Sequence, residues 1–363
     1  MKQSNSIYNP FIRTTDTTSR VMLDVIISLI PCIVMSYMAF GVSALSLIAV
    51  SVGSALIAEF LFSLVFCNRL DTLSDGSAVV TGILMAFTLG AFTPLYVVSF
   101  GAVMAVIFGK LLWGGIGRNL FNPALVGREF MTVFFPTVMT SGSIWYNADA
   151  VNHASLALSG NTLLDELIFK SSGALGEYSI ACLTLGGLYL LLRRRITWHV
   201  PFTLLTVFII SIFVMKALGA ENLSFSLGGL ILGAVFMATD MPSSPSTASG
   251  KCYYGGMIGL TAALFILMGV KYEYMSYSIL LLNGVVPFIS RCFKPRIWGM
   301  PFNYSSVVLG AVVITVCVVI VTVLISLAAS SKFNLILYLL DVYILYCIIR
   351  FVLANKNEGK LTK

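Results

Sequence analysis

Repeated apolar runs of about 20 residues constrain this 363-residue chain more than any other feature. Such runs cross a bilayer as helices, whereas the strands of membrane barrels give short segments of alternating polarity. Charged residues make up only 10% of the chain, compared with about 25% in soluble domains, and the mean hydropathy is +0.96. A soluble globule is therefore excluded, and the sequence predicts an all-α polytopic membrane protein.

Twelve segments have the apolar character expected of membrane helices. They are 21–40, 43–67, 77–93, 96–113, 118–139, 178–192, 198–218, 223–239, 253–270, 275–290, 303–329 and 333–354. About ten of these helices form a predicted core with a first membrane half at 1–139 and a second at 178–300, separated by an extracytoplasmic loop at 140–177. The last two lie in a C-terminal extension, 301–363. Because each half holds an odd number of spans, the halves are expected to have opposite orientations, which makes them an inverted repeat.

Lysine and arginine are unevenly distributed between alternate loops. With the N-terminus inside, only Lys170, Lys216, Lys271 and Lys332 of the 22 Lys and Arg residues lie in outer segments, and the other 18 lie in cytoplasmic segments or within the predicted spans. Basic residues concentrate in cytoplasmic loops, so this asymmetry predicts a multi-pass protein with both termini in the cytoplasm. The net charge of +7 is thus a signal of topology, and no nucleic-acid partner is expected.

A polar segment, GRNLFNPALVGREF at 117–130, interrupts the fifth apolar run. Its side chains that lipid would exclude are Asn119, Asn122, Arg128 and Glu129. Pro123 lacks a backbone N–H and blocks a continuous helix. The segment therefore predicts a broken membrane helix around a buried polar site, a pattern typical of transport and cofactor sites.

Two further motifs place polar residues at the ends of apolar segments. The acidic and hydroxyl residues that open DGSAVVTG (75–82) either cap a helix N-terminus or line a ligand site. In FMATDMPSSP (236–245), two prolines impose an extended stretch. Here Thr239 and Asp240 either bind a polar ring or an ion or belong to a plain connecting turn.

Motifs of soluble catalysis are missing from the sequence. It has no GxSxG, no Walker A motif, no HExxH, and no GxGxxG in a strand–helix context, so hydrolase, ATPase and soluble dehydrogenase interpretations gain no support. The seven cysteines are scattered and form no CxxC pair. No catalytic residue and no metal ligand is predicted.

Several motifs, in order along the chain, resemble the family of RnfD and NqrB. These are membrane subunits of Rnf ferredoxin:NAD oxidoreductases and of sodium-pumping NADH:quinone oxidoreductases. The matching stretches are NPFIR at 9–13, DGSAVVTG at 75–82, GGIGRNLFNPALVGREF at 114–130, GALGEYS at 173–179, GGLYLLLRRRITWHVP at 186–201, FMATDMPSSP at 236–245 and NGVVPFISRCFKPRIWG at 283–299. The resemblance covers about 1–300, and RnfD is the nearer of the two.

The resemblance implies a flavoprotein subunit of the inner (cell) membrane. It would work with the other subunits of an Rnf-type complex, surrounded by membrane lipid, and would couple ferredoxin and NAD redox chemistry to Na⁺ or H⁺ translocation. Such a protein is not active alone. A second, noncovalent flavin such as riboflavin is implied in the membrane part, with Asn119, Asn122, Thr239 and Asp240 as its neighbours.

The resemblance also implies FMN attached through a phosphoester in the outer loop. The family pattern Asp-x-x-Ser-Gly-Ala-Thr aligns with Asp149 to Ser155, where Ser155 replaces the threonine and keeps the hydroxyl that a phosphoester needs. Asn152 and His153 replace the Ser-Gly pair, and the histidine adds bulk at a tight position.

Two other interpretations stay open at the level of sequence. One is a solute transporter with a broken-helix site and no redox role. The other is a divergent family member that has lost covalent flavin. The family usually ends soon after the Lys294–Pro295–Arg296 stretch, so the two additional C-terminal segments are expected to serve packing or partner contact.

Overall fold

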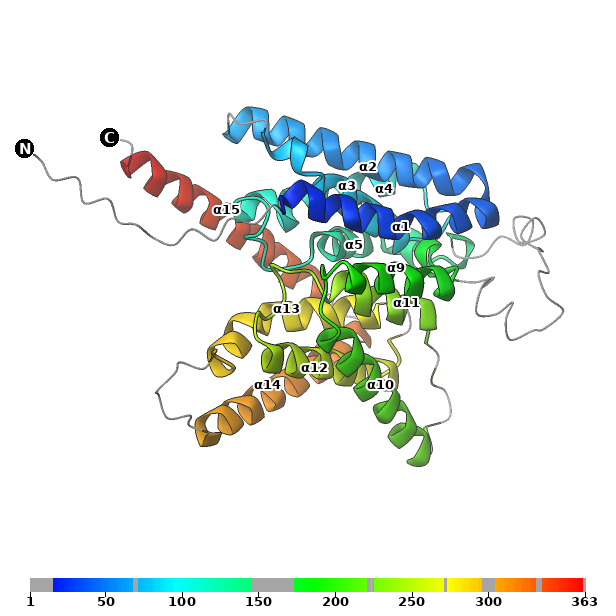
Figure 1. Cartoon of the computed structure of the whole chain (residues 1–363), viewed down its shortest axis with the longest axis vertical. Helices are drawn as coiled ribbons and strands as arrows, with labels where there is room; N and C mark the ends of the chain where they lie inside the picture. Colours follow the sequence, from blue (N-terminus) through cyan, green and yellow to red (C-terminus); the bar gives the residue numbers. More distant parts are fainter. Residues whose placement is uncertain are drawn as a thin grey trace, which may run out of the picture.

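All regular secondary structure in the described part of the chain is helical (Figure 1). The computed structural model describes residues 16–67, 71–144, 173–220, 223, 225–270, 273–295, 304–330 and 335–361. The prediction of an all-α polytopic membrane protein is confirmed for these residues, which include eight helices long and apolar enough to cross a membrane.

The helices follow the predicted segments closely. In the first half they are α1 (Thr18–Phe40), α2 (Val42–Phe62) continued by the π-helix η1 (Ser63–Cys67), α3 (Ser77–Phe87), α4 (Leu95–Gly109) and α5 (Pro123–Phe134). In the second half they are α9 (Ile180–Leu192), α10 (His199–Ala217), α11 (Leu227–Leu232) continued by η6 (Gly233–Met237), α12 (Ala248–Leu267) and α13 (Tyr274–Cys292). The extension forms α14 (Tyr304–Ser330) and α15 (Leu335–Leu361). Short turns are η2 (Asp71–Asp75), η3 (Leu111–Trp113), α6 (Pro136–Met139), η4 (Gly142–Ile144) and η5 (Leu175–Glu177).

Three of the twelve predicted spans are longer than the helices that form there. The segments 77–93, 118–139 and 223–239 form α3, α5 and the α11–η6 unit, which have 11 or 12 residues, whereas 178–192 agrees with the 13-residue α9. At 1.5 Å per residue such a helix is too short to cross a hydrocarbon core of about 30 Å alone. The prediction of broken helices is thereby confirmed, with more short helices than the sequence indicated.

Local chemistry explains where two of these short helices begin. Asn122 caps α5, because its Oδ1 accepts a hydrogen bond from the Ala124 N–H (3.0 Å) and Pro123 occupies the first helical position. At α3 the Asp75 carboxylate accepts from the Ser77 N–H (2.8 Å), and Gly76 adopts φ +77°. Asp75 therefore caps α3, and Ser77 of the same motif also lines the cavity described below, so the two interpretations do not exclude each other.

The two halves repeat one packing order. In each half the second helix packs on the fourth and the fourth on the fifth, and the two first helices, α1 and α9, pack on each other. The start of α1 lies beside the end of α9, so these two helices run in opposite directions. The start of α3 faces the same cavity as the end of η6, so α3 and η6 also run in opposite directions. That is the arrangement an inverted repeat requires. In Figure 1, α1 to α4 lie at one end of the molecule, α10, α12 and α14 lie at the other, and α5 and α9 lie between them.

Glycines allow the closest of these helix contacts. A Cβ on Gly186 of α9 would collide with the Ser28 carbonyl oxygen on α1, and a Cβ on Gly127 of α5 would come within 2.5 Å of the Gly101 carbonyl oxygen on α4. Small residues let membrane helices approach closely and gain van der Waals contact that lipid would not supply.

The extension packs across both halves, which confirms the expected packing role. On α14, the Ala311 carbonyl accepts a hydrogen bond from Tyr253 Oη (2.9 Å). On α15, Tyr343 Oη donates to the Phe108 carbonyl (2.9 Å), and the Arg350 guanidinium lies 4.1 Å from the ring centroid of Trp113. α14 therefore packs on the second half, and α15 packs on α4 and η3 of the first half.

Candidate functional site

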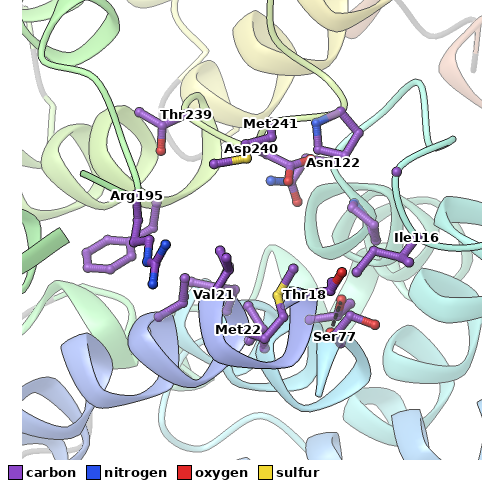
Figure 2. A pocket seen from close by; sticks show the side chains of 18 of the residues that line it. Thr18, Val21, Met22, Ser77, Ile116, Asn122, Arg195, Thr239, Asp240 and Met241 are labelled. Atoms are coloured by element: carbon purple, nitrogen blue, oxygen red, sulfur yellow. Dashed lines mark hydrogen bonds between the residues drawn. The ribbon is translucent and has the colours of Figure 1, made fainter. Parts of the chain in front are cut away.

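A cavity of about 450 Å³ lies between α1, α3, α5, α9 and the connection from η6 to α12. This volume is within the usual range for small-molecule sites, about 300–1,000 Å³. Figure 2 shows Val21 and Met22 of α1 facing Asp240 and Asn122 across the hollow, with Arg195 on one side and Ser77 on the other. All four residues predicted to neighbour a noncovalent flavin, Asn119, Asn122, Thr239 and Asp240, line this cavity.

Asn122 holds two broken helices together at the cavity wall. Besides capping α5, its Nδ2 donates to the carbonyl of Met237 at the end of η6 (3.2 Å). Its backbone N–H donates to the amide oxygen of Asn283 on α13 (3.1 Å), in the amide orientation in which Asn283 also donates to the Ser243 carbonyl (3.1 Å). The amide of Asn122 is therefore committed to protein contacts, and its part in the site is to position the other lining residues.

Asp240 presents a carboxylate to the cavity. Asn119 Nδ2 donates to Asp240 Oδ2 (3.2 Å), and Ser243 Oγ donates to the same oxygen (2.9 Å). Among the described residues, both hydrogen bonds to this carboxylate are made to Oδ2, so Oδ1 is available to a ligand. Thr239 also lines the cavity, and because its hydroxyl donates to the Val235 carbonyl, its oxygen can still accept a hydrogen bond.

A buried ion pair at the cavity wall was not predicted from the sequence. Lys110, after α4, lies 2.6 Å from the carboxylate of Glu59 on α2, and the two side chains are 3% and 0% exposed. Lys110 also donates to the hydroxyl of Ser77, and Asp75 is 4.0 Å away. The signal that could have revealed the pair is a single acid inside one apolar run and a single base at the end of another.

A second missed cluster lies at one side of the cavity. Arg195, after α9, binds Asp24 of α1 (2.6 Å) and Asp16 (2.9 Å), and Arg193 contacts Asp24 at 3.2 Å. Hydrogen bonding to Arg195 holds the pKa of the exposed Asp16 carboxyl below its usual range. Because Asp16 and Arg195 both line the cavity, this cluster connects the first helices of the two halves beside the site.

The remaining walls are apolar and suit a flat ring. They include Val25 and Met22 from α1, Val80 and Leu84 from α3, and Phe236 from η6. A flavin needs apolar contact for its ring faces and hydrogen-bonding groups for the polar edge of its ring system. The cavity offers apolar walls together with Asp240 and Thr239 as acceptors, and the nearby Lys110 and Arg195 are each paired with carboxylates.

The residue predicted to carry covalent FMN, Ser155, lies outside the described residues, as does most of the 140–177 loop. The structure therefore brings together the four predicted residues of the membrane site, and Ser155 stays a prediction.

The sequence pattern of the NQR2, RnfD, RnfE family matches residues 5–299. The chain belongs to this family. Curated relatives support the membership: the chain is 37% identical over 304 residues to the D component of the Na⁺-translocating ferredoxin:NAD⁺ oxidoreductase complex of Acetobacterium woodii, an alignment that covers 80% of this chain and 94% of that protein.

Two further relatives of this family carry similar names. The chain is 34% identical to the D component of the proton-translocating ferredoxin:NAD⁺ oxidoreductase complex of Clostridium ljungdahlii, over 80% of this chain and 95% of that protein. It is 31% identical to the D component of the ion-translocating oxidoreductase complex of Stutzerimonas stutzeri, over 78% and 92%. The family match ends before α14, so α14 and α15 lie outside it.

Proposed function

We propose that this chain is the electron-carrying membrane subunit of an Rnf-type complex that couples ferredoxin:NAD⁺ redox chemistry to Na⁺ or H⁺ translocation. Family membership supports the assignment, since the related proteins are named as components of such complexes. The observation that carries it is the 450 Å³ cavity, which combines apolar walls with the polar residues predicted from the sequence. The other subunits of the complex and membrane lipid are its partners.

In this proposal a noncovalent flavin, such as riboflavin, occupies the cavity. When bound, a flavin accepts and donates one or two electrons. Asp240 or Thr239 would accept a hydrogen bond from the ring N–H, and apolar residues such as Val25 and Leu84 would surround the ring system and exclude water. Asn122 keeps α5 and η6 at the spacing that the ring requires.

The test is the flavin content of the purified complex. Flavin released by acid and quantified by chromatography is expected to fall several-fold in Asp240→Ala, which removes the acceptor from the cavity. The control is Asp341→Ala, because Asp341 is exposed on α15 and does not line the cavity. Equal flavin in both variants would show that Asp240 does not hold the ligand, and a wild-type complex without noncovalent flavin would favour the solute-transporter interpretation.

Covalent FMN at Ser155 is the second part of the proposal. The hydroxyl of Ser155 forms the phosphoester in the outer loop, as the family pattern around Asp149 implies. Ser155→Ala is expected to abolish flavin fluorescence of the denatured chain, while the nearby Ser159→Ala keeps it. A wild-type chain that lacks fluorescence when a flavin transferase is co-expressed would favour a family member that has lost covalent flavin.

The proposed orientation places both termini and the Arg195 cluster on the cytoplasmic side of the inner membrane. The excess of Lys and Arg in alternate loops supports this orientation. The 140–177 loop then lies on the outer side, where a covalent flavin at Ser155 would be placed.

A further inference from the structure

A second cavity, of about 290 Å³, lies between α5, α13, α14 and α15. Its lining is almost entirely apolar, with Phe121, Val126, Leu280 and Leu340 among its residues, and it contains one carboxylic acid, Glu129. Leu339 is 52% exposed, so part of the wall belongs to the outer surface of the helical assembly. No residue of this cavity lines the flavin site.

Glu129 is buried in this cavity, and the described part of the chain offers its carboxyl no hydrogen-bond partner. Glu129 is only 7% exposed, and neither of its carboxyl oxygens has a hydrogen-bond partner among the described residues. The adjacent Arg128 does not compensate it, because its guanidinium binds both oxygens of Glu273 (2.8 and 3.0 Å) and also donates to the Thr88 carbonyl. The positive charge beside Glu129 is thus already matched by another carboxylate.

An ionised carboxylate in such a place is strongly unfavourable. Water is replaced by apolar side chains, and the charge has no donor to stabilise it, so the group is more stable when it binds a proton. The ionisable groups around it do not change this balance. They are Arg128 on α5, Glu273 and Tyr277 at the start of α13, Tyr343 on α15 and, facing Arg128, Glu177 of η5; α14 contributes the apolar Ile325.

We propose that Glu129 is a proton-binding site in the membrane interior, reached through the apolar cavity and separate from the flavin site. The carboxylate takes a proton from hydronium to give a neutral carboxylic acid and water, and the reverse step releases it. No redox step is involved. No group of three His, Cys, Asp or Glu residues in the described part of the chain could hold a metal ion, and the lining around Glu129 offers no second carboxylate.

The C-terminal extension forms part of the cavity around Glu129, and this extension lies outside the residues that match the family. Ile325 of α14 and Leu340 and Tyr343 of α15 form one wall, and both helices follow the last matched residue. Tyr343 Oη donates to the Phe108 carbonyl (2.9 Å), so it holds α15 in place and its proton does not serve Glu129. Removal of the extension would open the carboxyl to lipid.

Dicyclohexylcarbodiimide is the probe, because it enters apolar regions and reacts with protonated carboxyl groups. The acid gives its proton to one nitrogen of the carbodiimide and its oxygen bonds to the central carbon. An acyl shift from oxygen to nitrogen then forms a stable N-acylurea, so the peptide gains the whole mass of one reagent molecule. Membranes that contain the intact protein are treated, and each carboxyl is examined by tandem mass spectrometry.

The expected result is an adduct on Glu129 that decreases as the pH rises and is unaffected by sodium at constant pH. Glu129→Gln is expected to lose it completely. Glu273→Gln is expected to reduce it, since the uncompensated Arg128 would then favour ionised Glu129. Glu59, which is paired with Lys110, serves as the buried control that stays unlabelled, and Asp341, exposed on α15, reports that the reagent reached the helices.

Two results would overturn the proposal. One is an absence of adduct on Glu129 in the wild-type protein while Asp341 reacts. The other is protection of Glu129 by sodium, which would assign the carboxyl to a metal cation. Because the adduct is mapped on the wild-type chain, the outcome does not depend on whether Glu129→Gln folds, and because flavin is not involved it does not depend on the proposed electron-transfer role.

Discussion

Replacement of Arg128 by methionine should destabilise the membrane part of this protein substantially. Arg128 is buried on α5 and joins the start of α13, through a bidentate pair with Glu273, to the end of α3, through the Thr88 carbonyl. Removal of one partner of a buried ion pair costs about 3–5 kcal/mol, because the other charge is left uncompensated. The unpaired Thr88 carbonyl accounts for about 1–3 kcal/mol on its own.

The double variant Arg128→Met/Glu273→Met separates these two contributions. It leaves no uncompensated charge and retains only the loss at Thr88, so it should be more stable than Arg128→Met by about 3–5 kcal/mol. The free energy of unfolding is measured by SDS titration in mixed micelles. Arg118→Met is the matched control, because Arg118 is exposed and its replacement should change stability by less than about 0.5 kcal/mol. A double variant no more stable than Arg128→Met would refute the assignment of the cost to an uncompensated buried charge.

Three further outcomes are expected. Asn122→Leu removes the cap of α5, worth about 1 kcal/mol, and the contact of Asn122 with η6. Flavin content and electron transfer should therefore be lost while membrane insertion is retained. Normal turnover in this variant would mean that the segment is only a structural kink. Gly186→Val should weaken the packing of α1 on α9, because a side chain there collides with the Ser28 carbonyl, whereas Gly53→Val, with open space around it, should unfold at the same SDS concentration as the wild type. A cysteine placed at Ser159 should react with an impermeant maleimide added from outside, and reaction only after permeabilisation would reverse the proposed topology.

Much of the membrane site was predictable from sequence because lipid excludes polar groups. Asn119, Asn122, Thr239 and Asp240 lie beside prolines at the ends of apolar runs, and the structure brings all four to one cavity. A polar residue in such a position must find protein or ligand, and Pro123 indicates where the helix breaks. The class of protein followed from the same physics, since apolar runs of this length have few other stable locations.

The lengths of the short helices depended on tertiary structure. Hydropathy alone does not distinguish a full span from a helix of 11 to 13 residues followed by a buried loop, as at α3 and the α11–η6 unit. Such a loop is stable only where other helices supply hydrogen-bond partners, as Asn122 does for the Met237 carbonyl. Those partners come from distant parts of the chain and leave no periodic pattern beside the break.

The sequence by itself determined that this chain is a helical membrane protein of a known family, with polar breaks at defined positions. Only the tertiary structure decided which charges meet. Lys110 pairs with Glu59 across 51 residues, and Arg195 pairs with Asp24 across 171. It also decided that Arg128 is neutralised by Glu273 while Glu129, its neighbour in sequence, has no partner among the described residues. The reason is physical: the sign and spacing of charges are local properties of a sequence, but their pairing depends on how helices far apart in the chain pack together.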